Sequence, residues 1–189
     1  MQKFEGIAYR TANNWFSVVD VNEYKNKPIT YLEIGAFYGA NLLSVADTYA
    51  SHQDSKLFCI DPWEDYDDYT EYKDMQGSIY ETFTKNVTNS PHRDKISAIR
   101  GYSHAEIHKF PDNFFDIVYI DGNHNAEYVL EDAVLCHRKL KNNGYMIFDD
   151  FGWGGPDLTQ KGIECFHKTY CKQYRFLGIY NTQFFLKKK

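Results

Sequence analysis

The sequence lacks any hydrophobic run long enough to cross a membrane, and this absence narrows what the protein can be. A membrane-spanning helix needs about 20 consecutive apolar residues, and no apolar run of the chain approaches that length. The initial stretch, MQKFEGIAYR, also lacks the apolar core of a secretory signal peptide. We therefore expect a cytoplasmic protein that does not act on a membrane.

Cysteine and positive charge are scarce as well. The four cysteines show none of the paired spacings that bind zinc. Cys59 and Cys136 lie in apolar periodic segments, which predicts buried, reduced thiols. The 21 Lys and Arg are outnumbered by 26 Asp and Glu, which gives a net charge of −5. A nucleic-acid partner favours a concentrated basic face, so we expect none.

The chain does contain a regular alternation of predicted strands and helices. Strands are expected over 30–35, 56–61, 95–100, 115–121 and 145–150, and helices over 40–50, 74–89, 103–109, 126–140 and 159–170. Two terminal strands, YRFLGIY and TQFFLKK, are joined by the short connection Asn181-Thr182, which predicts an antiparallel pair. The pattern predicts a doubly wound, Rossmann-like α/β fold whose seven-stranded sheet is mostly parallel and ends in an antiparallel hairpin.

The length and the details of the helices lead to further expectations. With 189 residues the chain fits one domain, and residues 1–27 are expected to form a helical extension that covers the site or builds a homodimer contact. In helix 126–140 we expect an apolar stripe, and Asn143-Gly144 is expected to close that helix as a cap. The stripe comprises Leu130, Ala133, Val134, His137 and Leu140.

Acidic residues follow four of the five predicted parallel strands. They are Glu33, Asp61, Asp121 and the pair Asp149-Asp150. In sheets of this kind, ligands bind beyond the carboxyl ends of the strands. The acids therefore mark the edge at which we expect the functional site.

The stretch EIGAFYGANL joins the first strand to the first helix. Gly35 and Gly39 allow the backbone to turn tightly and a ligand to approach, although Phe37 fills the middle position of a G-x-G-x-x-G motif. Asp61 ends the second strand, 22 residues after Gly39. An acid there can accept hydrogen bonds from both hydroxyls of a ribose. The alternative role of Asp61 is to cap a helix or the turn before Pro62.

Three carboxylates, Asp121, Asp149 and Asp150, are expected to gather at the ends of neighbouring strands. They would repel one another unless a cation or protons compensate, and their oxygen atoms suit Mg²⁺, Mn²⁺ or Ca²⁺. His124 lies three residues after Asp121, where an imidazole could act as a general base. Two alternatives remain open. The pair Asp149-Asp150 could cap the next helix or bond the following loop, and His124 could simply begin helix 126–140.

These motifs also resemble a known family. YLEIGAFYGANL, the acid in LFCIDPW, IRGYSHAEI and VYIDGNH follow one another as in class I S-adenosylmethionine-dependent methyltransferases, over most of residues 30–155. The resemblance implies that Glu33 and the loop 35–39 lie near the methionine part of the cofactor and that Asp61 holds the ribose. It also implies that the corner after the third strand borders the adenine, while Trp63 either covers the adenosine or serves as an interface or lid. The cofactor-binding set that follows is Glu33, Gly35, Ala36, Gly39, Asp61, Trp63, Tyr102, Ser103 and Asp121.

The arrangement Asp-x-x-His followed by Asp-Asp resembles metal-dependent O-methyltransferases, and most of all those that methylate macrolide sugars, in which a His at this offset is the base. Catechol-type enzymes have Lys there, and a related sugar-methylating group has Asp where this chain has Asn123. The resemblance implies S-adenosylmethionine and Mg²⁺ or Mn²⁺ as cofactors. It further implies Asp121, Asp149 and Asp150 as metal ligands, His124 as the base, and a sugar or glycan hydroxyl as the small-molecule acceptor.

Other functions stay open at this point. A catechol-like phenolic acceptor is the alternative within the class, and a nicotinamide-dependent oxidoreductase or a non-catalytic nucleotide-binding protein could use the same fold. The loop 61–74, with seven acids and four aromatic residues, is expected to be either a lid or a wall for the substrate. Trp153, in the loop FGWGGPD, is expected to wall the acceptor pocket.

Overall fold

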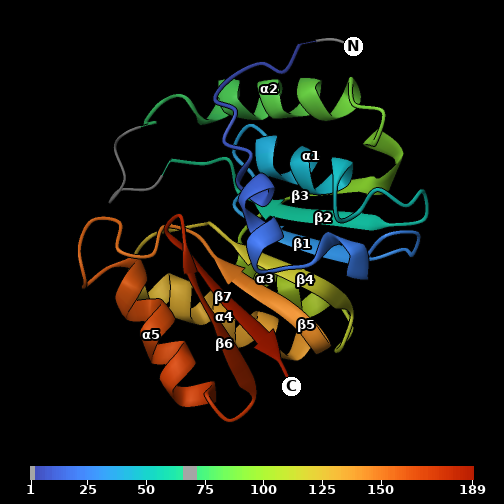
Figure 1. Cartoon of the computed structure of the whole chain (residues 1–189). Helices are drawn as coiled ribbons and strands as arrows, with labels where there is room; N and C mark the ends of the chain where they lie inside the picture. The colour runs from blue at the N-terminus through green and yellow to red at the C-terminus, as the bar shows by residue number, and fades with distance from the viewer. Residues whose placement is uncertain (1–2, 66–71) are drawn as a thin grey trace.

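One sheet of seven strands runs through the molecule, and helices cover both of its faces (Figure 1). The computed structural model describes residues 3–65 and 72–189. The strand order is β3-β2-β1-β4-β5-β7-β6. Strands β1 to β5 pair in parallel, whereas β7 pairs antiparallel with both β5 and β6. The predicted doubly wound, Rossmann-like fold with its antiparallel hairpin is confirmed.

The element bounds lie close to the predicted ones. The strands are β1 (Thr30–Ile34), β2 (Lys56–Asp61), β3 (Ile96–Arg100), β4 (Phe115–Ile120), β5 (Leu140–Phe148), β6 (Tyr174–Tyr180) and β7 (Gln183–Lys188). The α-helices are α1 (Ala40–Asp47), α2 (Gln76–Thr88), α3 (Ser103–Glu106), α4 (Ala126–Lys139) and α5 (Thr159–Tyr170). Short 3₁₀ helices are η1 (Thr11–Ser17), η2 (Val21–Glu23), η3 (Arg93–Lys95) and η4 (Ile107–Lys109).

The central strands are buried on both faces, as helix coverage of both sides of a parallel sheet requires. Successive side chains of a strand point to opposite faces, and β1 shows this directly. Tyr31 packs in the core beside α1, whereas Leu32 packs in the core beside α4. In β4, Tyr119 packs in the core beside α1 and Val118 packs in the core beside α4. A tyrosine hydroxyl from each of two central strands is thereby brought to the α1 side, close to the carboxyl edge of the sheet.

The N-terminal extension forms two 3₁₀ helices, η1 and η2, rather than a regular helix over residues 1–27. Its sequence explains the difference, since Asp20 accepts a hydrogen bond from the backbone N–H of Asn22 and such local bonds compete with helix propagation. Trp15 is fully buried against the sheet, and its indole Nε1 donates to Gln183 Oε1 at 3.0 Å. The extension is therefore packed into the core.

Of the two expectations for helix α4, the apolar stripe is confirmed in part and the cap is wrong. Ala133 is buried and Leu130 packs against the core, as predicted, whereas Val134 is 39% exposed. The rest of the buried face consists of Val129, Asp132 and Cys136. Helix α4 also ends at Lys139 without Asn143-Gly144, because β5 begins immediately at Leu140. Gly144 is needed there for a close approach of two strands, since a Cβ at this position would lie 2.9 Å from the carbonyl oxygen of Asp116.

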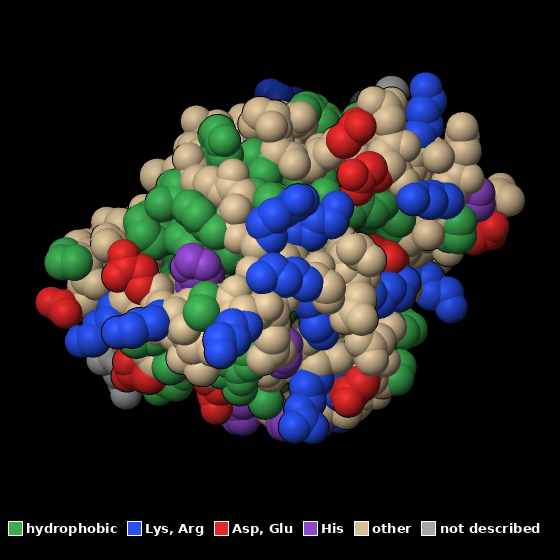
Figure 2. Space-filling view, turned by 60° about the horizontal axis from the view of Figure 1, so that its bottom comes forward, with side chains coloured by type: hydrophobic (Ala, Val, Ile, Leu, Met, Phe, Trp, Pro, Cys, Tyr) green, Lys and Arg blue, Asp and Glu red, His purple; other side chains and the backbone are tan. Residues whose placement is uncertain are grey.

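Cys59 and Cys136 are buried, free thiols, as predicted. In the part of the chain that the structure describes, no helix combines the length and the apolar character that a membrane crossing needs. Figure 2 shows one face on which Lys and Arg side chains gather near the middle, with hydrophobic side chains beside them. The net charge of −5 therefore does not describe every face of the molecule.

Candidate active site

A cleft of about 690 Å³ opens at the carboxyl edge of the sheet. The acidic residues at the carboxyl ends of β1, β2, β4 and β5 all line it, as do Gly35 and Ala36 of the loop after β1. Ile7, Tyr9 and Thr11 of the N-terminal segment line it from one side, and Trp153, Asn181 and Thr182 line it from another. The loop 61–74, predicted to be a lid or a wall, falls partly outside the described residues, which omit 66–71.

Glu33 lies at the floor of the cleft and is 1% exposed. The Tyr31 hydroxyl donates to Glu33 Oε2 at 2.5 Å, and the Asn41 side-chain amide donates to the same oxygen at 3.1 Å. Burial raises the pKa of Glu33 to about 8, although these hydrogen bonds oppose the shift. An acid held this way can exchange its proton near neutral pH, and it presents a fixed acceptor to a cationic ligand group.

Asp61 performs the turn-capping role that was left open, and it still lines the cleft. Its Oδ2 accepts from the backbone N–H groups of Ala36 at 2.8 Å and Phe37 at 3.0 Å, and its Oδ1 accepts from the N–H of Trp63 at 2.8 Å. Burial raises the pKa of Asp61 nevertheless. Each carboxylate oxygen has two acceptor positions, so capping uses three of the four and leaves one position, on Oδ1, for the ribose.

Gly35 allows the two central strands to meet at the cleft. Its φ is +81°, and a Cβ there would lie 2.0 Å from the carbonyl oxygen of Asp121. The Asp121 backbone N–H donates to the Ile34 carbonyl at 2.8 Å, which fixes the distance between these strand ends. A side chain at residue 35 is therefore sterically excluded, and this proximity brings Asp121 close to the loop 35–39.

Four residues of the predicted cofactor-binding set are not part of the cleft lining. Trp63 is 1% exposed and donates from its indole to the Phe37 carbonyl at 3.0 Å, so the structure places it in the core. Tyr102 is 44% exposed and donates to Glu64. Ser103 bonds the buried carboxylate of Asp132, and Gly39 starts helix α1. Contact of these four residues with the cofactor stays a prediction.

The second group of predicted residues converges around His124. Ligand atoms of Asp121, His124 and Asp150 all lie within 4.8 Å of one another. The imidazole Nε2 of His124 lies 3.2 Å from Asp150 Oδ2, and its ring packs on Trp153 with 4.5 Å between centroids. Two carboxylates and one imidazole form a donor set that suits Mg²⁺ or Mn²⁺, so these residues fit a divalent cation.

Asp149 lines the same cleft but is not in this group, and its role as a metal ligand stays a prediction. Strand β5 ends at Phe148, and a positive φ of 54° at Asp150 turns the next side chain toward His124. Asp149 instead accepts from the Tyr119 hydroxyl, and its Oδ1 accepts from the Asp150 backbone N–H at 2.9 Å. It therefore holds the turn that orients Asp150, and it partly fulfils the loop-bonding alternative.

The carboxylates of the cleft repel one another. Burial raises the pKa of Asp121 well above its ordinary value, and Asp149 and Asp150 raise it further. The pKa of Asp149 is raised by its burial first and then by Asp150. A cation between these groups would favour their ionised forms by offsetting this repulsion.

Sequence reasoning missed several residues that hold the site together. Asn41, Tyr31 and Tyr119 are buried hydrogen-bond partners of the acids. The signal that could have found them is a polar group at a core position, since Tyr31 and Tyr119 interrupt apolar strands and Asn41 follows the glycine loop. Such groups need a partner when buried.

The comparisons with known proteins now define the class. Residues 32–151 match the protein family described as "Methyltransferase domain". The chain therefore belongs to this family, and its seven-stranded fold and cleft are those of class I S-adenosylmethionine-dependent methyltransferases.

The chain is also similar to a curated protein of a large virus. An uncharacterized protein of Acanthamoeba polyphaga mimivirus is 27% identical over 155 residues, which cover 78% of this chain and 63% of that protein. The chain thus spans less than two thirds of that curated relative.

Solved structures share the fold at low identity. A candidate caffeoyl-CoA O-methyltransferase from Staphylococcus aureus superposes with a TM-score of 0.67 and 15% identity, over 98% of this chain and 86% of that one. A candidate rRNA-methylase from Clostridium thermocellum gives a TM-score of 0.68 and 13% identity, over 97% and 98%. At these identities the likeness shows the fold and not the substrate.

The buried Glu33 makes the stability of the metal-free protein depend on pH. Between about pH 4.5 and about pH 8, Glu33 is protonated in the folded protein and ionised in the unfolded chain, so unfolding releases a proton and stability falls as pH rises. Glu33→Gln should remove up to about 1.4 kcal/mol per pH unit from this slope. Urea unfolding in EDTA at about pH 5.5 and about pH 7.5 measures it.

Glu81→Gln is the matched control, because Glu81 is exposed on α2. It should leave the slope unchanged. An equal slope in wild type and Glu33→Gln would show that Glu33 does not carry a proton in the folded state.

Proposed function

We propose that this protein is an O-methyltransferase that transfers the methyl group of S-adenosylmethionine to a hydroxyl of a sugar or glycan, with the help of a divalent cation. One observation carries the proposal. The group Asp121, His124 and Asp150 lies in the same cleft as Glu33 and Asp61. A site for a cation and a proton acceptor thus adjoins the residues suited to hold the cofactor.

The cofactor side consists of Glu33, Asp61 and the loop 35–39. S-adenosylmethionine supplies an electrophilic methyl group on a sulfonium. The Glu33 carboxylate would accept from the amino group of the methionine part, and Asp61 would accept from a ribose hydroxyl. Both side chains are held by hydrogen bonds within the protein, so they need little reorganisation when the cofactor binds.

The acceptor side consists of Asp121, Asp150 and His124. A divalent cation held by the two aspartates supplies a lower pKa for a coordinated hydroxyl and a fixed position for it. The imidazole of His124 would accept the proton of that hydroxyl as the methyl group is transferred. Its distance of 3.2 Å from Asp150 also allows a second role as a metal ligand.

The walls beyond His124 support a hydroxylated acceptor. Trp153 offers an aromatic face, and Asn123, Asn181 and Thr182 offer donors and acceptors. Aromatic faces with polar groups around them are suited to sugar rings, whose hydroxyls need hydrogen-bond partners. A catechol-like phenol is the second candidate, since two vicinal oxygens would bind the same cation.

A panel of acceptors tests the substrate class. With labelled S-adenosylmethionine and Mg²⁺ or Mn²⁺, we expect label to appear on monosaccharides or glycans rather than on catechols. The polar walls favour that outcome by satisfying each hydroxyl. Methylation of catechols alone would replace the sugar proposal by the phenolic one.

Metal removal tests the role of the aspartates. EDTA should abolish transfer, and Mg²⁺ or Mn²⁺ should restore it. Asp150→Asn should weaken Mn²⁺ binding by roughly tenfold or more, because a neutral amide replaces an anionic ligand. Electron paramagnetic resonance of free Mn²⁺ measures the affinity. Asp157→Asn, in the same loop with a side chain that is 86% exposed, is the matched control. Full activity in EDTA would contradict the metal role.

The variant His124→Ala tests the role of His124. If His124 is the base, transfer should slow by roughly 10²- to 10⁴-fold, while the affinities for Mn²⁺ and S-adenosylhomocysteine stay close to wild type. A fall in Mn²⁺ affinity would instead identify His124 as a ligand. His108→Ala, an exposed histidine of η4, is the control for rate and affinity. An unchanged rate would place the base elsewhere.

A further inference from the structure

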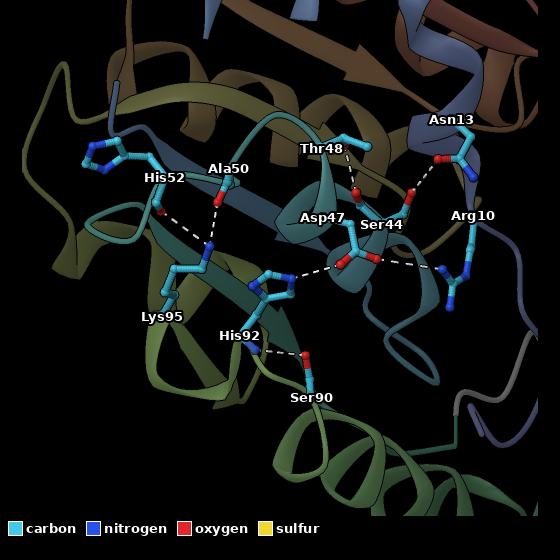
Figure 3. A network of polar contacts seen from close by, with 10 residues as sticks. All are labelled: Arg10, Asn13, Ser44, Asp47, Thr48, Ala50, His52, Ser90, His92 and Lys95. Carbon is cyan, nitrogen blue, oxygen red and sulfur yellow. Dashed lines mark hydrogen bonds and ion pairs between the residues drawn. The ribbon is translucent and has the colours of Figure 1, made fainter. Parts of the chain in front are cut away.

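The N-terminal segment precedes the matched family region, residues 32–151, and yet forms part of the cleft. Ile7, Tyr9 and Thr11 line the cleft. The segment reaches it along helix α1, to which its side chains attach it (Figure 3). This position raises the question of whether the segment only packs there or takes part in the site.

Two attachments of the segment lie away from the cleft. Figure 3 shows Asn13 and Arg10 directed at Ser44 and Asp47 of α1. The Ser44 hydroxyl donates to Asn13 Oδ1 at 3.1 Å, and Arg10 Nη1 lies 3.8 Å from Asp47 Oδ2. These contacts fix the segment in place without touching the acids of the cleft.

Thr11, between them, contacts residues of both halves of the site. Its hydroxyl donates to Asn41 Oδ1 at 2.8 Å and lies 2.9 Å from the Tyr119 hydroxyl. Asn41 is 7% exposed and Tyr119 is fully buried. Loss of the Thr11 hydroxyl would therefore leave buried polar groups with fewer partners, which costs free energy.

On the cofactor side, Thr11 determines how the Asn41 amide is oriented. Asn41 Oδ1 accepts from the Thr11 hydroxyl and from the Ala12 backbone N–H, both at 2.8 Å. With its oxygen held in this way, the amide must present its NH₂ group in the other direction. That group donates to Glu33 Oε2 at 3.1 Å. Thr11 thus helps to keep a donor on the carboxylate proposed to bind the cofactor.

The acceptor side is held by hydrogen bonds in which Thr11 is not the donor. A hydroxyl has one proton to donate, and Thr11 donates it to Asn41 Oδ1. The Tyr119 hydroxyl donates to Asp149, and its oxygen accepts from Gln183 Nε2 at 3.3 Å. Asp149 in turn accepts from the Asp150 backbone N–H at 2.9 Å. The Thr11 hydroxyl, although it lies 2.9 Å from Tyr119, therefore acts on the cofactor side.

We propose that Thr11 is a positioning residue for the cofactor half of the active site, because it orients Glu33 through Asn41. The inference rests on the proposed function, since it assigns an effect on cofactor binding to this hydroxyl. The N-terminal segment then contributes a defined chemical group to the site in addition to covering it.

The test compares Thr11→Val, which keeps the shape and removes the hydroxyl, with Thr11→Ser, which keeps the hydroxyl. Calorimetry measures the affinity for S-adenosylhomocysteine, and electron paramagnetic resonance measures the affinity for Mn²⁺. Thr11→Val should weaken the affinity for S-adenosylhomocysteine by roughly threefold to tenfold and leave the affinity for Mn²⁺ within about twofold of wild type. Thr11→Ser should stay within about twofold of wild type. Thermal melting by circular dichroism verifies that each variant folds.

Asn13→Ala is the matched control, because it removes an attachment of the same segment that does not reach the acids. Both affinities should stay within about twofold of wild type. The inference is overturned if Thr11→Val binds S-adenosylhomocysteine as wild type does, if it loses Mn²⁺ affinity to the same extent, or if Asn13→Ala loses as much as Thr11→Val. Wild-type protein that binds neither ligand would refute the proposed function itself, and the inference with it.

Discussion

Repulsion among five carboxylates at one edge of the sheet is the constraint on which the rest of this structure depends. Glu33, Asp61, Asp121, Asp149 and Asp150 all line one cleft. Burial raises the pKa of each of them, so keeping them charged costs free energy that other groups must offset. A fold that only needed stability would not gather acids in this way. We therefore attribute the clustering of these acids to the function of the cleft and not to the stability of the fold.

The protein meets this cost in two different ways. Glu33, Asp61 and Asp149 receive hydrogen bonds from buried side chains or backbone N–H groups. Asp121 and Asp150 are instead turned toward each other and toward His124. The first three are thus fixed by the chain itself, whereas the last two gain most from a cation. In the function proposed above, this division gives the cationic cofactor one end of the cleft and the metal-bound acceptor the other.

The fold could be predicted from the sequence because its signals are local. Apolar strands alternate with amphipathic helices, so the order and approximate bounds of the elements follow from periodicity. The carboxyl-edge rule then placed Glu33, Asp61, Asp121 and His124 on one side of the sheet. Glu33, Asp61 and Asp121 lie at strand ends, and an error of one residue in a predicted strand bound still leaves them at the carboxyl edge of the sheet.

The details of the site could not be predicted, because they depend on distant contacts. The end of β5 at Phe148 and the left-handed backbone at Asp150 decide which aspartate faces His124. Trp63 looks like a ligand-covering residue in the sequence, and only its packing against Phe83 and its bond to Phe37 place it in the core. The contacts of Thr11 with Asn41 and Tyr119 join segments that the sequence separates by 30 and 108 positions.

The hydrogen bond between Trp15 and Gln183 has a consequence for how the molecule is made. It spans 168 positions of the chain, and Gln183 also contacts Tyr119. During synthesis, the start of the chain leaves the ribosome long before this glutamine exists. The Trp15 indole N–H therefore lacks this acceptor until strand β7 pairs with β5 and β6. A nascent chain can build most of the sheet before that point, but the cleft takes its finished shape only after Gln183 has been added.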